Sequence, residues 1–207
     1  MLRYMQVNEG LLRGGIEGLS DEILKQQFML YKSAVQHLNS TQAELDAMRR
    51  EGRSENLLYR ERNPGPAAEW NKVLLYELYF ENLKNGKSDA CGSLTTALKR
   101  RWGSTEELKL EILRLSKSHY TNWLILGYDS YSDQLYLQQV DMRGLGLMIH
   151  QSVILCLNLA ESSYCRDFGA QGKNQYVEVL LENIDWNICQ FRYDRAREGL
   201  LPSRPCS

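Results

Sequence analysis

The spacing of apolar residues changes once along this chain of 207 residues, and that change is the strongest constraint on its fold. From Ser20 onward, apolar residues recur at alternating intervals of four and three, which is the period of an amphipathic helix. The apolar residues of this stripe are Leu24, Phe28, Tyr31, Val35 and Leu38. After residue 122 the apolar runs become short and strand-like. The chain is therefore predicted to be helical first and mixed later.

The first half of the chain is predicted to form a helical hairpin. Ser20 is a good N-cap for the first helix, and residues 42–53 extend it with a helix-favouring, charged composition. The run Asn63-Pro-Gly-Pro66 breaks the chain before a second helix, expected over about residues 67–83. The polar stretch 85–89 then marks the expected domain boundary.

The second half is predicted to contain helices around a small three-stranded antiparallel sheet. Ser104-Thr-Glu-Glu107 has the arrangement of a capping box and predicts a helix start. Strands are expected over residues 122–126, 134–139 and 152–159. A single last helix is expected from about 174 to 199, because one apolar stripe continues through it.

The predicted fold class is α+β, with a helical hairpin domain followed by an α/β domain. We expect an N-terminal extension over residues 1–18, the hairpin domain over 19–85, the α/β domain over 90–199 and a C-terminal tail over 200–207. With 43% hydrophobic and 25% charged residues, the composition is that of an ordinary globular protein.

Charge and cysteine content exclude several classes of protein. The formal net charge is −1 with both signs interspersed, so nucleic-acid binding has no support. The sequence has no apolar run of roughly 18 residues and no secretory signal, so we expect no membrane association and an intracellular, cytoplasmic protein. The basic, acid-poor start of the chain leaves a mitochondrial location as the alternative. Five widely spaced cysteines without a CxxC pair favour reduced thiols.

Several short motifs follow one another in an order that is known from one family. They are a helix from Leu19, the segment Asn71–Leu83 with its aromatic pair, Trp102-Gly-Ser104, Asn122-Trp-Leu-Ile-Leu126, the segment Val153–Tyr164 and Asn183-Ile-Asp-Trp186. Together they resemble the iron/manganese superoxide dismutases, from about residue 19 to residue 195. The resemblance implies a helical hairpin followed by an α/β domain.

The resemblance also implies a site for one iron or manganese ion, held in the family by three histidines and one aspartate. The corresponding positions here are Gln26 (or Gln27 if the helix register shifts by one), Tyr76, Asn158 and Ser162. Amides and hydroxyls are weak neutral ligands compared with imidazole and carboxylate, so we expect no cofactor and no catalytic residue at these vestigial positions. A Tyr76 phenolate can ligate iron, which leaves open a divergent enzyme that keeps iron or manganese.

The family forms dimers, and this implies how the chain associates. The family's counterpart of Glu161 reaches across the dimer interface, so Glu161 and nearby Tyr164 are predicted contacts in a homodimer or in a heterodimer with a similar domain. A larger assembly is a further alternative, because degenerate proteins of this fold occur in the small subunit of the mitochondrial ribosome. We hypothesise a non-catalytic interaction or scaffold module. The alternative is a divergent dismutase that converts superoxide to oxygen and hydrogen peroxide with an unusual ligand set.

Overall fold

The computed structural model describes residues 5–12, 14–63, 65–118, 121–141 and 146–199, and the predicted C-terminal tail lies outside them. The helices are α1 (Asp21–Arg50), α2 (Leu57–Arg62), α3 (Gly65–Glu81), α4 (Gly92–Trp102), α5 (Thr105–Ser116), α6 (Cys165–Phe168), α7 (Lys173–Glu182) and α8 (Trp186–Arg197), with short 3-10 turns η1 (Glu9–Leu11) and η2 (Glu161–Ser163). The strands are β1 (Trp123–Asp129), β2 (Gln134–Val140) and β3 (Gln151–Asn158). The predicted α+β fold is confirmed.

The long helix α1 begins where the sequence predicts it. The Ser20 side chain accepts a hydrogen bond from the backbone N–H of Ile23 at 3.1 Å, which caps the helix. Ser20 in turn donates through its backbone N–H and its hydroxyl to the carboxylate of Asp167, at 2.8 and 2.7 Å. This pair ties the start of α1 to α6, far along the chain.

The sheet has the strand order β2-β1-β3, and both pairings are antiparallel. The central strand β1 is buried along its whole length, as the apolar run in its sequence predicts. Trp123 at the start of β1 pairs with Val140 and Asn158, and Asp129 at its end pairs with Gln134 and Gln151. Asn158 and the β1–β2 turn therefore lie at opposite ends of the sheet.

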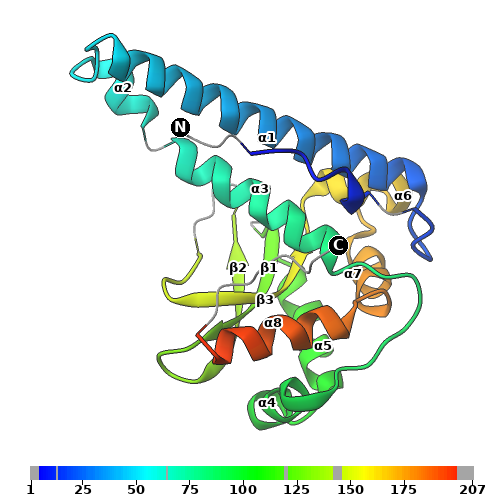
Figure 1. The fold of residues 1–207 in the computed structure, drawn as a ribbon. Coiled ribbons are helices and arrows are strands. Elements are labelled where there is room, and N and C mark those ends of the chain that lie inside the picture. Colours follow the sequence, from blue (N-terminus) through cyan, green and yellow to red (C-terminus); the bar gives the residue numbers. More distant parts are fainter. Residues whose placement is uncertain (1–4, 13, 64, 119–120, 142–145, 200–207) are drawn as a thin grey trace.

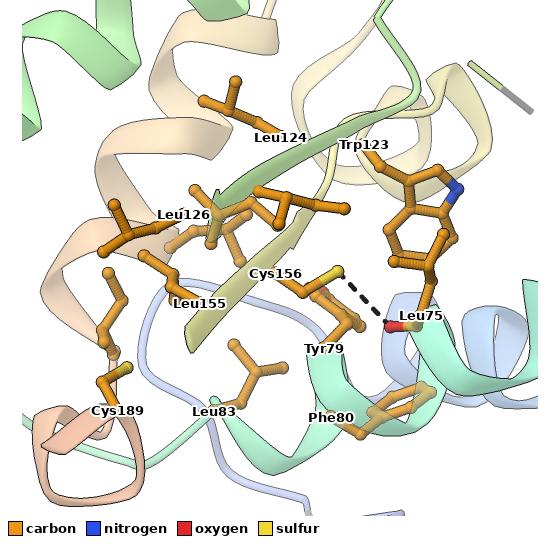
Figure 2. Close-up of a cluster of buried hydrophobic side chains, with 14 of the residues drawn as sticks. Leu75, Tyr79, Phe80, Leu83, Trp123, Leu124, Leu126, Leu155, Cys156 and Cys189 are labelled. Atoms are coloured by element: carbon orange, nitrogen blue, oxygen red, sulfur yellow. Dashed lines mark hydrogen bonds between the residues drawn. The ribbon is translucent and has the colours of Figure 1, made fainter. Parts of the chain in front are cut away.

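Helices cover the sheet from two sides. Figure 1 shows the α1–α3 hairpin above the sheet, with α8, α5 and α4 below it. The apolar side chains of α3, β1, β3 and α8 meet in one core, where the Cys156 thiol donates to the carbonyl of Leu75 at 3.5 Å (Figure 2). Trp123 and Trp186 are both buried in this core.

The prediction of a single last helix is wrong. The chain forms α7 and α8, and the break lies at Asn183, whose side-chain amide donates to the carbonyls of Glu17 and Val179 at 2.9 and 2.8 Å. Asp185 then caps α8 by accepting from the Asn187 N–H. The apolar stripe hides this break because it continues on the same face of both helices.

Three helices, α2, α4 and α6, were not predicted from the sequence. Helix α2 buries none of its residues, so its sequence lacks the helical spacing of apolar residues that predicts an amphipathic helix. Among the described residues, no helix combines the length and the apolar character needed to cross a membrane.

Candidate functional site: a buried polar cluster between α1, α3 and the sheet

The two alternatives at the first predicted site position differ in burial. Gln27 on α1 is completely buried, whereas Gln26 is exposed and does not reach the interior. The amide nitrogen of Gln27 donates to the backbone carbonyl of Ser163 at 3.3 Å. The placement of Gln27 follows from the helical period, because residues three before and four after it, Leu24 and Tyr31, are also buried.

A one-residue difference in burial also occurs in the loop after β3. The predicted pocket residue Ser162 is exposed, and its neighbour Ser163 is the buried serine of this loop. The reason is the 3-10 turn η2, which ends at Ser163 and rotates successive side chains by roughly a third of a turn. Ser163 is 0% exposed.

Tyr76 and Asn158 form the second part of the cluster. Tyr76 packs edge-on against Trp123, with ring centroids 5.1 Å apart. Burial raises the pKa of the Tyr76 phenol to about 12, and a hydrogen bond with Asn158 opposes that rise. The side-chain oxygen of Asn158 accepts from the backbone N–H of Ala160 at 3.2 Å, which fixes the amide at the end of β3.

Two further tyrosines join Gln27 to the rest of the cluster. The hydroxyls of Tyr79 on α3 and Tyr176 on α7 lie 3.2 Å apart in the interior. Burial raises the pKa of Tyr79 to about 12 and that of Tyr176 well above its ordinary value, while contacts with Gln27 oppose both rises. Figure 2 shows the Tyr79 side chain beside β3. Both phenols therefore stay neutral near pH 7.

Three polar atoms of the cluster have no hydrogen-bond partner among the described residues. They are Oε1 of Gln27, Nδ2 of Asn158 and Oγ of Ser163. Buried polar groups are normally paired by hydrogen bonds. Three unpaired polar atoms in one cluster therefore mark it as a candidate functional site and distinguish it from the apolar core. The cluster combines an acceptor, a donor and a hydroxyl that can do either.

The donor set of the cluster does not fit the iron or manganese ion that the resemblance implies. Its side chains are two amides, one serine hydroxyl and neutral phenols, without imidazole or carboxylate. No group of three or more His, Cys, Asp or Glu residues suited to a metal occurs in the described part of the chain. His37 lies on the surface near Glu69, and His150 is also exposed.

The two predicted interface residues lie next to this cluster. Glu161 is exposed at the start of η2, and Tyr164 is buried against Tyr176, with ring centroids 5.8 Å apart. Tyr164 therefore packs mainly within its own chain, while Glu161 faces outward.

Sequence reasoning missed Tyr79, Tyr176 and Ser163 as members of the cluster. Tyr79 carried a usable signal, since it follows Tyr76 by three residues and thus lies on the same face of α3. Tyr176 carried no such sequence signal, because its contact with Tyr79 joins segments 97 residues apart.

Comparison with known proteins identifies the relatives of this chain. Residues 90–192 match the model of the iron/manganese superoxide dismutase C-terminal domain. The chain is 30% identical over 187 residues to an iron superoxide dismutase of Cupriavidus metallidurans, covering 87% of this chain and 91% of that protein. It is 24% identical over 201 residues to an iron superoxide dismutase of Aquifex aeolicus, covering 94% and 93%. A manganese superoxide dismutase of Haloferax volcanii is 30% identical over 126 residues, 60% of this chain and 62% of that protein.

These relatives correct one prediction. The expectation that no cofactor is involved is wrong, because the matching proteins are named as iron or manganese superoxide dismutases. The metal content of this protein therefore has to be measured. The absence of imidazole and carboxylate from the buried polar cluster is a separate observation.

Proposed function

Because this chain belongs to the iron/manganese superoxide dismutase family, we propose that it keeps the fold of that family as a non-catalytic interaction module. The observation that carries the proposal is the chemistry of the buried cluster. At the positions that the resemblance assigns to the family's metal ligands, or one residue beside them, Gln27, Tyr76, Asn158 and Ser163 offer only neutral side chains.

The protonation state of the phenols supports this proposal. Tyr76 is the one residue of the set that can become an anionic ligand, and its pKa of about 12 keeps it protonated near pH 7. The amides of Gln27 and Asn158 carry no charge at any physiological pH. The residues of the cluster therefore offer no charged group for catalysis.

The proposed interaction is pairing with a second copy, or with a similar chain, through the surface at η2. Glu161 supports this choice, since it is exposed there and makes no ion pair with any described residue. Tyr164 behind it is packed on Tyr176, which gives the surface a rigid base. A larger assembly that contains such a pair belongs to the same proposal.

Two further features belong to the proposal. The hairpin domain is assigned to residues 19–85 and the α/β domain to 90–199, supported by the linker between α3 and α4. A cytoplasmic location is supported by the four described cysteines, Cys91, Cys156, Cys165 and Cys189, all of which are free thiols.

The experiment measures metal, activity and association on the same purified protein. Elemental analysis and a superoxide assay are run beside the iron superoxide dismutase of Cupriavidus metallidurans as a positive control. The expected result is no turnover above background together with a dimer in light scattering. Stoichiometric iron or manganese with turnover would contradict the proposal and would establish the divergent enzyme.

The interface is tested by charge reversal. Glu161→Lys is expected to weaken the dimer, because it reverses the charge at the centre of the proposed surface. Glu106→Lys on α5 is the matched control, since it reverses an exposed charge away from η2. Equal association of both variants would show that η2 is not the interface.

A further inference from the structure

An arginine-lined groove lies at the end of the sheet opposite the buried polar cluster. It consists of two adjoining hollows of about 380 and 220 Å³, which share Ala97, Arg100 and Asp133. The groove is formed by α4, the β1–β2 turn and the end of α8, which lie together in the lower part of Figure 1. It is separated from Asn158 by the length of β1, about 20 Å.

The β1–β2 turn is a rigid wall of this groove. The Asp129 carboxylate accepts from the backbone N–H groups of Tyr131 and Ser132, both at 3.1 Å, and from the Ser132 hydroxyl at 2.6 Å. Asp133 follows in the left-handed region at φ 50°, and its carboxylate accepts from the Tyr128 hydroxyl at 2.9 Å. The groove is therefore preformed by hydrogen bonds of the turn itself.

Arg100 lines both hollows. Its guanidinium donates to the backbone carbonyl of Asp133 at 3.2 Å and lies 3.5 Å from the Asp133 carboxylate. Arg100 and Asp133 thus largely neutralise each other.

Two other arginines face the hollows without a carboxylate partner among the described residues. Arg101 lines the larger hollow, and its guanidinium carbon lies 5.8 Å from the ring centroids of Trp102 and Tyr136. Arg197 lines the smaller hollow, and its guanidinium carbon lies 5.8 Å from the ring centroid of Tyr193. A cation–π contact with an aromatic ring does not occupy the N–H donors of a guanidinium, which stay open to a ligand.

Helix ends explain only part of this charge. Arg101 and Arg197 lie in the last turns of α4 and α8, where cations offset a partial charge of about −0.5 per helix. Among the residues that line the groove, three arginines stand against one aspartate, so the lining itself is positively charged. Stabilisation of two helix ends by arginines also does not explain why both arginines line the same groove.

We propose that this groove binds a small organic bisphosphate, with one phosphate in each hollow. The planar guanidinium of Arg101 would pair with one phosphate and that of Arg197 with the other, since the arginine fork matches phosphate oxygens in a bidentate manner. The combined size of the hollows is that of a small-molecule site. The site is independent of the polar cluster and of the proposed dimer surface.

Calorimetric titration of the full chain with fructose 1,6-bisphosphate, used as the probe, tests this assignment. Binding of one molecule per chain with a dissociation constant of about 1 mM or lower is expected, with inorganic phosphate at least about tenfold weaker. Failure of the probe to bind, or equal affinity for inorganic phosphate, would overturn the proposal. Tight binding of a single-stranded RNA without binding of the probe would overturn it as well.

Variants separate a built site from general charge. Arg101→Gln and Arg197→Gln should each reduce the affinity to about that of inorganic phosphate, whereas Arg114→Gln, an exposed arginine paired with Glu111 on α5, should leave it unchanged. Arg101→Lys keeps the charge but loses the fork, so it should also weaken binding. Circular dichroism confirms that each variant folds, and equal effects of all four substitutions would contradict the site.

Discussion

The guanidinium of Arg192 on α8 donates to the carboxylate of Glu81 at the end of α3, with Nη2 and Oε2 2.8 Å apart. The same guanidinium donates to the side-chain oxygen of Asn82 and to the backbone carbonyls of Ile154 and Leu78. Arg192 is only 4% exposed, so these contacts replace its hydration almost completely. One side chain therefore joins the last helix to the hairpin and to β3.

The first prediction follows from that contact. Arg192→Met should lower the free energy of unfolding by about 3–5 kcal/mol, because it leaves the partly buried Glu81 carboxylate and the buried oxygen of Asn82 without their donor. Urea denaturation measures the loss. Arg114→Met is the control, since Arg114 is exposed and its ion pair with Glu111 contributes at most about 1 kcal/mol. A loss below about 1 kcal/mol for Arg192→Met would mean that the cluster around it does not hold α8 in place.

The second prediction compares a fully buried tryptophan with an exposed one. Trp186→Ala should cost about 3–5 kcal/mol, because Trp186 is among the largest fully buried side chains and its removal leaves a cavity in the core. Trp70→Ala should cost far less, since Trp70 is 40% exposed. Denaturation of both variants gives the comparison, and similar losses would show that α8 does not close the core.

Much of the fold was predictable because local signals agreed with tertiary packing. The cap at Ser20, the capping box at Ser104 and the apolar run of β1 each specify an element without reference to the rest of the chain. The break at Asn183 was not predictable in this way. It depends on hydrogen bonds to Glu17 and on backbone pairing with Lys84, which are distant in sequence.

At two positions of the candidate site, the buried residue and the residue named from the resemblance differ by at most one. The resemblance alone left Gln26 and Gln27 open, and burial then selected Gln27, which the helical period of Leu24 and Tyr31 also favoured. The choice between Ser162 and Ser163 depends on the twist of a short 3-10 turn, for which the sequence carries no periodic signal.

The third prediction is a loss of stability at alkaline pH. Burial raises the folded-state pKa of Tyr76 and Tyr79 to about 12, above their ordinary value of 10.0. A phenol with a raised folded pKa contributes stability that is fully present below about pH 10 and is lost as the pH rises toward 12, because the unfolded chain releases the proton more readily. Urea denaturation at several pH values between about 9 and 11 should show this fall.

A variant pair tests the origin of that slope. Tyr79→Phe removes one buried phenol, so the fall in stability with pH should become shallower. Tyr131→Phe is the control, because Tyr131 is 95% exposed and loses little hydration on folding. An unchanged slope in Tyr79→Phe would show that the Tyr79 phenol does not contribute to the alkaline loss.

The fourth prediction tests whether the backbone of the polar cluster still presents its side chains as a metal site would require. Gln27→His, Tyr76→His, Asn158→Asp and Ser163→His, introduced together, should increase the affinity for manganese above that of the natural chain. The reason is that imidazole and carboxylate replace neutral donors at positions that the structure places in the interior. Metal titration followed by elemental analysis measures the change.

A second fourfold variant is the matched control for that experiment. It keeps Tyr76→His and Asn158→Asp but places the other two histidines one residue earlier, as Gln26→His and Ser162→His, where the side chains are exposed. Because only the first variant directs all four ligands into the cluster, it should bind manganese more tightly than the control, and loss of any one of its ligands should reverse most of the gain. Equal affinities would show that the cluster no longer has the geometry of a metal site.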